Sequence, residues 1–287
     1  MALLRDSARQ LSNTTKTNAQ WSGIMPRWLL NFLPTSQVEA GTFRVNAVKQ
    51  CAELLCEHET GDKLTETFIN IDDKPREYKL STIQTVIKAH TQTIDLYNSP
   101  YDQLGEQFRI AAEAIQEETE ARYIASKDFG LSAQCSDDMR VTGSSPNPDT
   151  MDDLLGMIWK QPAFFIMHPR AMVRFGQECT ARGVCIGTVE MFGSPFFTWR
   201  GVPIVPSDKI NVGNDGSTEV MLLRVGEDRQ GVVGLSGTAK TGREIAPGIT
   251  AKFNGTDEQG LQRFLLTRYV SLAVSVPDAL GILKVKI

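Results

Sequence analysis

The chain has 287 residues, of which 41% are hydrophobic and 22% are charged, and its formal net charge is −4. It is long enough for a sizeable core, and no apolar run approaches the ~20 residues of a membrane helix. The start of the chain lacks a secretory signal, and the acidic balance disfavours nucleic-acid binding, so we expect a cytoplasmic protein that binds neither membrane nor nucleic acid.

The first 80 residues predict two elements that need partners. Residues 1–33 are rich in Thr, Asn, Ser and Gln between scattered apolar anchors, and they include Trp21 and Trp28. Such a segment buries too little by itself to offset its ordering entropy, which predicts an arm lying on another surface. Between Thr42 and Leu80, β-prone stretches flank a turn at Gly61-Asp62, which predicts a long, extended β-hairpin.

Two helices are expected next. From Ser81 to Tyr97 the pattern predicts a helix with Ser81 as the N-cap. The residues that recur at helical spacing are Ile83, Val86, Ile87, His90 and Ile94. From Tyr101 to Ile124 a longer amphipathic pattern predicts a structural spine of about six turns.

The segment Cys135–Thr150 has the Ser, Pro, Asn and Gly composition of a flexible connector, and it is the best boundary between lobes. Asp149 or Thr150 is expected to cap a short helix that runs through Trp159. The residues Phe164–Pro169 predict a buried strand stopped by proline, and Arg170–Arg182 a helix that ends at Gly183.

The stretch Thr198–Lys209 predicts a strand, a tight turn and a second extended segment. Gly201 permits a sharp bend, while Pro203 and Pro206 hold the backbone extended. Taken alone, it fits either a subunit-placing element or an ordinary proline-bounded edge strand. A turn at 214–216 and a strand at 219–225 follow, and residues 264–287 have mixed strand character.

The sharpest catalytic alternative is Gly234–Thr241, one residue away from a phosphate-binding P-loop. Ala239 replaces the required glycine before Lys240, and the following residues, which include Pro247, cannot sustain the helix that such a loop opens into. We expect a flexible surface loop, with a small nucleotide-binding enzyme using Lys240 as the competing hypothesis.

Other reactive residue types lack a supporting pattern. His58, His90 and His168 have no zinc-type spacing, and the five cysteines include no CxxC pair, which fits reduced packing residues. Four glutamates of the long helix are expected to form a solvated acidic face: Glu113, Glu117, Glu118 and Glu120. The aromatic runs at 164–166 and 191–197 are expected to form core and subunit contacts. We therefore assign no catalytic, cofactor-binding or metal-binding residue, and the residues themselves indicate an assembly-forming structural protein.

Several sequence blocks carry a family resemblance. The segment Arg200–Lys209 resembles the turn of tailed-phage major capsid proteins of the Hong Kong 97 type, and the chain as a whole is more similar to encapsulins of the second family. The blocks that carry this similarity are Ala8–Lys16, Pro26–Leu30, Val38–Gly41, Arg44–Asn46, Pro75–Tyr78, Leu96–Pro100, Phe197–Lys209 and Gly226–Gly234.

The resemblance implies an α+β capsid fold with five segments. They are an N-terminal arm (1–41), an extended loop (42–80), a peripheral domain with the spine helix (81–149), an axial domain (150–260) and C-terminal strands that return to the core (261–287). It also implies self-assembly into an icosahedral shell of ~60 copies.

Members without an inserted cyclic-nucleotide-binding domain, for which this chain leaves no room, enclose a cysteine desulfurase and are linked with sulfur metabolism and storage. No catalytic residue is carried over, and the cargo-binding and pore-lining residues stay unassigned. A phage or prophage capsid protein is the alternative within the same assembly class.

Overall fold

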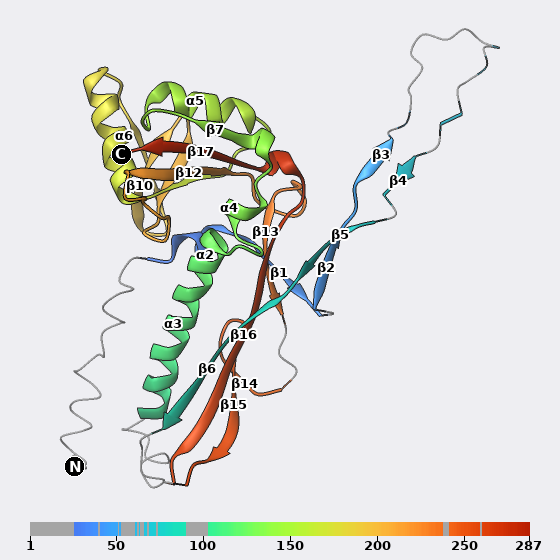
Figure 1. Ribbon diagram of the computed structural model, residues 1–287, viewed down its shortest axis with the longest axis vertical. Coiled ribbons are helices and arrows are strands. Elements are labelled where there is room, and N and C mark those ends of the chain that lie inside the picture. The colour runs from blue at the N-terminus through green and yellow to red at the C-terminus, as the bar shows by residue number, and fades with distance from the viewer. Residues whose placement is uncertain are drawn as a thin grey trace.

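A computed structural model describes residues 26–39, 41–50, 52, 61, 63, 66–67, 69–72, 74–89, 103–237, 241–258 and 260–287. The molecule is elongated, with a helix-covered sheet at one end, a long sheet beside a single helix at the other, and a thin hairpin projecting from the side (Figure 1). The structure combines helices with two large β-sheets, and each of these sheets contains both parallel and antiparallel strand pairs. This architecture confirms the α+β class.

A seven-stranded sheet forms the first half. In spatial order its strands are β7 (Arg140–Thr142), β17 (Leu280–Lys286), β12 (Ser217–Leu223), β8 (Phe164–Met167), β11 (Val202–Pro206), β10 (Ser194–Trp199) and β9 (Gly187–Met191). Because side chains alternate along a strand, Phe165 packs against α5 (Pro148–Met157) and α6 (Pro169–Ala181), whereas Phe164 and Ile166 face the rest of the molecule. All four residues of β8 are fully buried, which confirms the predicted strand.

The second half is a six-stranded sheet packed against one long helix. Its strands are β1 (Thr35–Val38), β13 (Val232–Gly237), β16 (Gln262–Val274), β15 (Ile249–Thr256), β14 (Arg243–Ala246) and β6 (Ser81–Ala89). The helix is α3 (Gln103–Ala125), which confirms the predicted spine, and it runs alongside β6 and β16 (Figure 1). The strands β13 to β15 thus lie in this sheet although they belong to the expected segment 150–260.

The predicted hairpin of residues 42–80 is described at its base and middle. The strand β2 (Thr42–Val45) pairs with β5 (Arg76–Lys79), and further out β3 (Val48–Gln50) pairs with β4 (Asn70–Ile71). The amide of Asp72 donates to the carbonyl of Ala47 at 2.9 Å, which keeps the two arms together between the pairs.

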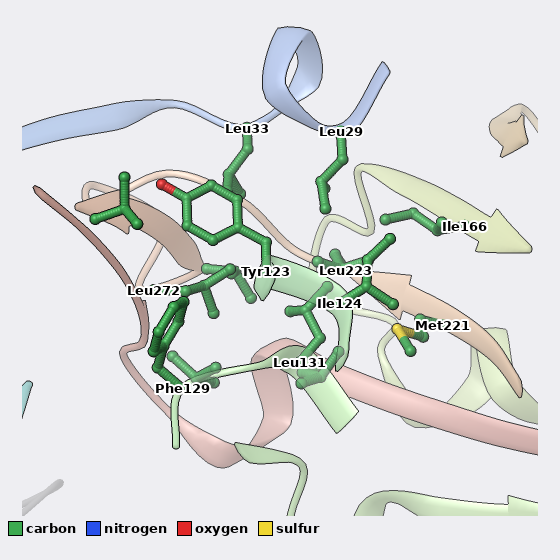
Figure 2. Close-up of a cluster of buried hydrophobic side chains, with 14 of the residues drawn as sticks. Leu29, Leu33, Tyr123, Ile124, Phe129, Leu131, Ile166, Met221, Leu223 and Leu272 are labelled. Carbon is green, nitrogen blue, oxygen red and sulfur yellow. The ribbon is translucent and has the colours of Figure 1, made fainter. Parts of the chain in front are cut away.

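Short elements join the two halves around a shared core. They are α2 (Trp28–Phe32), α4 (Leu131–Gln134) and two 3-10 turns, η3 (Asp137–Met139) and η4 (Pro277–Ala279). Leu33 lies over the Tyr123 ring, and Leu29, Ile124 and Leu223 of the seven-stranded sheet belong to the same cluster (Figure 2). The end of the predicted arm is therefore anchored to the core through α2 and β1, while residues 1–25 fall outside the described residues.

The helix predicted for Ser81–Tyr97 is wrong over its described part, because Ser81–Ala89 is the strand β6. All nine residues pair with β16, from Ser81 opposite Val270 to Ala89 opposite Gln262. The apolar spacing suited both structures, since Ile83 and Ile87 share a face in either. Five β-branched residues between 82 and 87 favour the strand, and pairing with a long neighbour decides it.

The connector predicted for 135–150 is also wrong in part, because it contains η3 and β7, and β7 extends the seven-stranded sheet by pairing with β17. The cap of α5 is Asn147 instead of Asp149 or Thr150. Its Oδ1 accepts from the Thr150 amide at 3.0 Å, and its own amide donates to the Thr150 hydroxyl at 3.1 Å.

The turn predicted in Thr198–Lys209 is present. Trp199 pairs with Val202, so Arg200 and Gly201 form a two-residue hairpin turn, with φ of 50° and 85°. The segment is not an edge, because β11 lies between β10 and β8 inside the sheet. The proline-bounded edge strand is therefore excluded.

Candidate assembly surfaces

The projecting hairpin is fixed at its base and exposes apolar side chains further out. Tyr78 is buried, and its hydroxyl donates to the carbonyl of Val274 at 2.7 Å. Beyond this anchor, Ile69 is 63% exposed and Ile71 is 51% exposed. Apolar side chains on a thin two-stranded projection are suited to burial against another chain.

A cluster of aromatic rings holds α2 against the turn between β9 and β10. Trp28 contacts Phe196 with the ring centroids 4.9 Å apart, and Phe32 contacts Phe192 and Phe164 at 5.0 and 5.1 Å. Phe196 is buried, as expected for a core residue, but Phe192 remains 59% exposed. The aromatic run thus supplies both an intramolecular contact and a partly open apolar surface.

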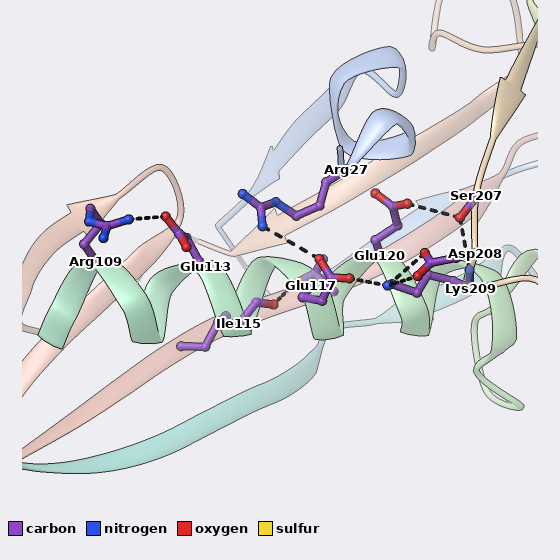
Figure 3. A network of polar contacts seen from close by, with 10 residues as sticks. Arg27, Arg109, Glu113, Ile115, Glu117, Glu120, Ser207, Asp208 and Lys209 are labelled. Atoms are coloured by element: carbon purple, nitrogen blue, oxygen red, sulfur yellow. Dashed lines mark hydrogen bonds and ion pairs between the residues drawn. The ribbon is translucent and has the colours of Figure 1, made fainter. Parts of the chain in front are cut away.

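A polar cluster lies where α3, the residues after β11 and the start of α2 meet (Figure 3). Glu117 forms ion pairs with Lys209 and, at 3.7 Å, with Arg27. One turn further along α3, Glu120 accepts a hydrogen bond from the Ser207 hydroxyl at 3.2 Å. Lys209 also pairs with Asp208 at 2.9 Å. We call these six residues the junction cluster, since they connect α3, the end of β11 in the seven-stranded sheet and the N-terminal segment.

The surroundings of the junction cluster shift the pKa values of two of its residues. Glu120 is only 2% exposed, and this burial raises the pKa of Glu120 to about 7, with the charge of Glu117 adding to the effect and the Ser207 hydrogen bond opposing it. For Lys209, burial is outweighed by its hydrogen bonds to Glu117 and Asp208, and its pKa is raised. The prediction of a solvated acidic face is therefore wrong for Glu120, which enters the protein interior.

A second polar contact fixes the two-residue turn of the β10–β11 hairpin. Asp152 on α5 accepts from Trp199 Nε1 at 2.7 Å and from Arg200 Nη2 at 2.9 Å, and the guanidinium lies over the Trp199 ring. The hydrogen bond from Arg200 lowers the pKa of Asp152. The turn is thus bound to the helix layer above the sheet.

A mostly apolar groove of about 550 Å³ runs between α3 and β6. Its lining includes Ile83 and Ile87 from the strand and Ile110 and Ala114 from the helix, with Lys88 and Glu118 at its polar parts. Such a composition provides surface for packing and no arrangement of nucleophile and base.

The near P-loop is not a loop over its first half. Gly234–Gly237 is part of the buried strand β13, so the expected surface loop is wrong for these residues. A side chain at Gly234 would meet Leu33 at 3.2 Å. Lys240 lies outside the described residues. Because a phosphate cradle needs free backbone amides before a helix, and these residues are paired in a sheet, the geometry opposes the nucleotide-binding hypothesis.

His168 and the three described cysteines differ in their contacts and in their burial. His168 Nδ1 accepts from the Arg170 amide at 3.1 Å and so caps α6. Cys135 and Cys179 are buried, and burial raises the pKa of Cys135 to about 11, whereas Cys185 is exposed. His58, His90, Cys51 and Cys56 lie outside the described residues. In the described ranges no group of three or more His, Cys, Asp or Glu could hold a metal ion, and no helix is long and apolar enough to cross a membrane.

Comparison with known proteins decides the family. The family model for type 2A encapsulin shell proteins of the SrpI-like group matches residues 41–287. The chain is 46% identical to the type 2A encapsulin shell protein SrpI of Synechococcus elongatus, over 98% of this chain and 92% of that protein. The chain belongs to the SrpI-like type 2A encapsulin shell proteins.

Solved structures agree with this membership. The holo-SrpI encapsulin complex from Synechococcus elongatus superposes with a TM-score of 0.83 at 44% identity, over 99% of this chain and 95% of that one. The capsid protein of cyanophage P-SCSP1u superposes with a TM-score of 0.58 at 10% identity, over 95% of this chain and 91% of that one, and so shows the fold alone. The encapsulin subunit thus has the tailed-phage capsid fold, and it is a shell protein that forms a capsid-like nanocompartment.

The sequence interpretation missed the junction cluster. Glu113, Glu117 and Glu120 follow one another at spacings of four and three, which places them on one stripe of α3 but does not show what covers that stripe. One available signal was the polar run Ser207–Lys209 directly after the apolar strand β11. A charged run there must either reach solvent or find partners.

Proposed function

We propose that copies of this encapsulin subunit close into an icosahedral shell of ~60 subunits that encloses a cysteine desulfurase for sulfur metabolism or storage. The observation that carries the assembly part is the hairpin of residues 42–80, which projects away from the core (Figure 1). Its outer part carries Ile69 and Ile71, which are more than half exposed. A projection of this kind gains stability when it lies across a neighbouring copy. Heterologous contacts of that type close into rings or shells.

Within this shell, the subunit would be divided as in a phage capsid protein. The seven-stranded sheet with α5 and α6 would form the axial domain, and α3 with the six-stranded sheet would form the peripheral domain. Residues 1–41 would be the N-terminal arm and 42–80 the extended loop. The chain crosses between the domains at 224–231 and 275–279, so residues 232–274 would belong to the peripheral domain.

Two considerations support an enclosed enzyme. The sequence carries no catalytic motif, and no group of three or more His, Cys, Asp or Glu in the described ranges could hold a metal ion, so the proposal gives the chemistry to a cargo protein. The related SrpI structure is that of a holo encapsulin complex. The desulfurase identity and the sulfur role rest on the family resemblance.

Electron microscopy of the purified protein tests the assembly. Uniform hollow particles with the mass of about 60 subunits are expected, whereas a stable monomer or dimer at micromolar concentration would contradict the proposal. Particles that contain DNA would favour a phage capsid instead.

Co-expression tests the cargo. A cysteine desulfurase encoded beside the shell gene should co-purify with the particles, and loaded particles given cysteine should accumulate elemental sulfur. An unrelated soluble enzyme of similar size, expressed at the same level, is the control. Equal capture of both enzymes, or of neither, would reject the desulfurase.

A further inference from the structure

Glu120 lies among charged residues without an ion pair of its own. Glu117 pairs with Lys209 and Arg27, and the exposed Asp208 also pairs with Lys209. Glu120 is 2% exposed, and its partner in the cluster is the Ser207 hydroxyl. An ionised Glu120 would be a buried charge with no cation at ion-pair distance among the described residues, so its surroundings favour the protonated form.

The geometry around Glu120 marks it as the group that takes the proton. Its Oε1 accepts from Ser207, while its Oε2 is buried and has no hydrogen-bond partner among the described residues. Glu117, by contrast, lies between Lys209 and Arg27 and forms an ion pair with each (Figure 3). The pKa of Glu120, raised to about 7 chiefly by burial, agrees with this assignment.

Further charges near the cluster belong to neighbouring elements. Tyr123, on the next turn of α3, interacts with Arg268 of β16, and His168 at the start of α6 interacts with Asp208. These residues do not hydrogen-bond to Glu120. The protonation equilibrium of Glu120 is therefore set by the residues of the junction cluster.

The cluster connects three parts that a shell subunit must hold in place. Arg27 directly precedes α2, Glu117 and Glu120 belong to the spine helix, and Ser207 and Lys209 follow strand β11 of the seven-stranded sheet. We propose that the junction cluster is a proton-operated latch, in which protonation of Glu120 tightens the connection between the seven-stranded sheet, the spine helix and the N-terminal segment. Acidification thereby stiffens each subunit, and a rise in pH loosens it.

The sign and size of the effect follow from linkage. A carboxyl group with a pKa of about 7 in the closed latch and the ordinary 4.5 in an open one binds protons more tightly when closed. The stabilisation is therefore complete below about pH 4.5, falls as the pH rises, and is lost above about pH 7. Between pH 8.5 and pH 5.5 the opening equilibrium should fall about thirty-fold.

Hydrogen exchange of assembled particles, followed by mass spectrometry at pH 5.5, 7 and 8.5, measures this opening. After correction for the intrinsic pH dependence of exchange, protection of residues 26–33 and 207–210 should be about thirty-fold higher at pH 5.5 than at pH 8.5. In Glu120→Gln, which imitates the protonated acid, protection should be high and nearly independent of pH. The matched control is Glu118→Gln, since Glu118 on the same helix is half-exposed and pairs with Arg122 outside the junction cluster; it should keep the wild-type profile.

A wild-type pH profile in Glu120→Gln particles would overturn the latch. If that variant does not assemble, Ser207→Ala decides, because it removes the hydrogen bond that favours the ionised form of Glu120. The midpoint of the profile should then move to higher pH, and an unchanged or lowered midpoint would contradict the proposal. A flat profile in intact particles rejects the latch alone, whereas loss of particles concerns the assembly.

Discussion

The seven-stranded sheet and the projecting hairpin use apolar residues in opposite ways. In β8, Phe164, Phe165 and Ile166 are at most 1% exposed, and side chains from both faces of the strand enter a core. On the hairpin, Ile69 and Ile71 remain more than half exposed. The sheet completes its burial within one subunit, whereas the hairpin leaves these two side chains exposed. Under the proposed function, the first region folds the subunit and the second contacts a neighbouring copy in the shell.

Removing the hairpin should produce the largest change. Ala47 and Asp72 are hydrogen-bonded neighbours, so residues 48–71 can be replaced by an Asn-Gly turn without stretching the base. We expect a folded subunit, by circular dichroism and cooperative melting, that forms no closed particles in electron microscopy. Normal particles from this variant would show that the hairpin is dispensable for assembly.

Truncating a core side chain should destabilise the subunit itself. Phe165→Ala leaves a cavity between β8 and the helices α5 and α6, and it should cost about 3–5 kcal/mol in the free energy of unfolding. Phe197→Ala, at a position in the same sheet that is 42% exposed, should cost far less. Chemical denaturation of the hairpin-less subunit measures both, and equal losses would contradict the distinction.

The same substitution should have opposite signs at two glycines. Gly201 has φ of 85°, so Gly201→Ala should cost about 1 kcal/mol through backbone strain, although nothing lies near the added methyl group. Gly156 lies on the exposed side of α5 with equally open surroundings, and Gly156→Ala should stabilise by about 0.5–1 kcal/mol. Melting of the two variants beside the wild type compares them, and a shared sign would contradict the argument.

The smallest expected effect concerns the contact between Asp152 and the two-residue turn. The lowered pKa of Asp152 means that this contact is present above the ordinary carboxyl pKa of about 3.8 and is lost as the pH falls through the lower, folded value. Asp152→Asn should remove this acid sensitivity and cost about 1 kcal/mol or less at neutral pH, because the site is partly exposed. Denaturation at pH 7 and pH 3 checks it, with Asp153→Asn, an exposed neighbour, as control.

The local sequence pattern was sufficient to predict those elements whose residues are compatible with only one secondary structure. The strand β8 was predicted because the apolar run Phe164–Met167, closely followed by Pro169, is typical of a buried strand. The spine helix was predicted from the amphipathic periodicity of Tyr101–Ile124, and the turn at Arg200-Gly201 was predicted from a glycine flanked by β-prone residues. Family membership followed from blocks spread along the chain.

Where the local pattern was compatible with two structures, pairing with a strand far away in the sequence decided between them. Ser81–Ala89 has apolar spacing for a helix or a strand, and nine pairs with β16, nearly two hundred residues away, made it a strand. Arg140–Thr142 resembles a connector until β17 provides an edge for it. Neither partner is visible in the local sequence.

The sequence by itself determined the subunit's class, its spine, its buried central strand and its membership of a shell-forming family, because periodicity, proline and glycine act over short ranges. Only the tertiary structure decided that Glu120 is buried with Ser207, Lys209 and Glu117. A carboxyl group on a helix takes its pKa from what covers it, and the covering residues arrive from a segment about ninety positions further along the chain.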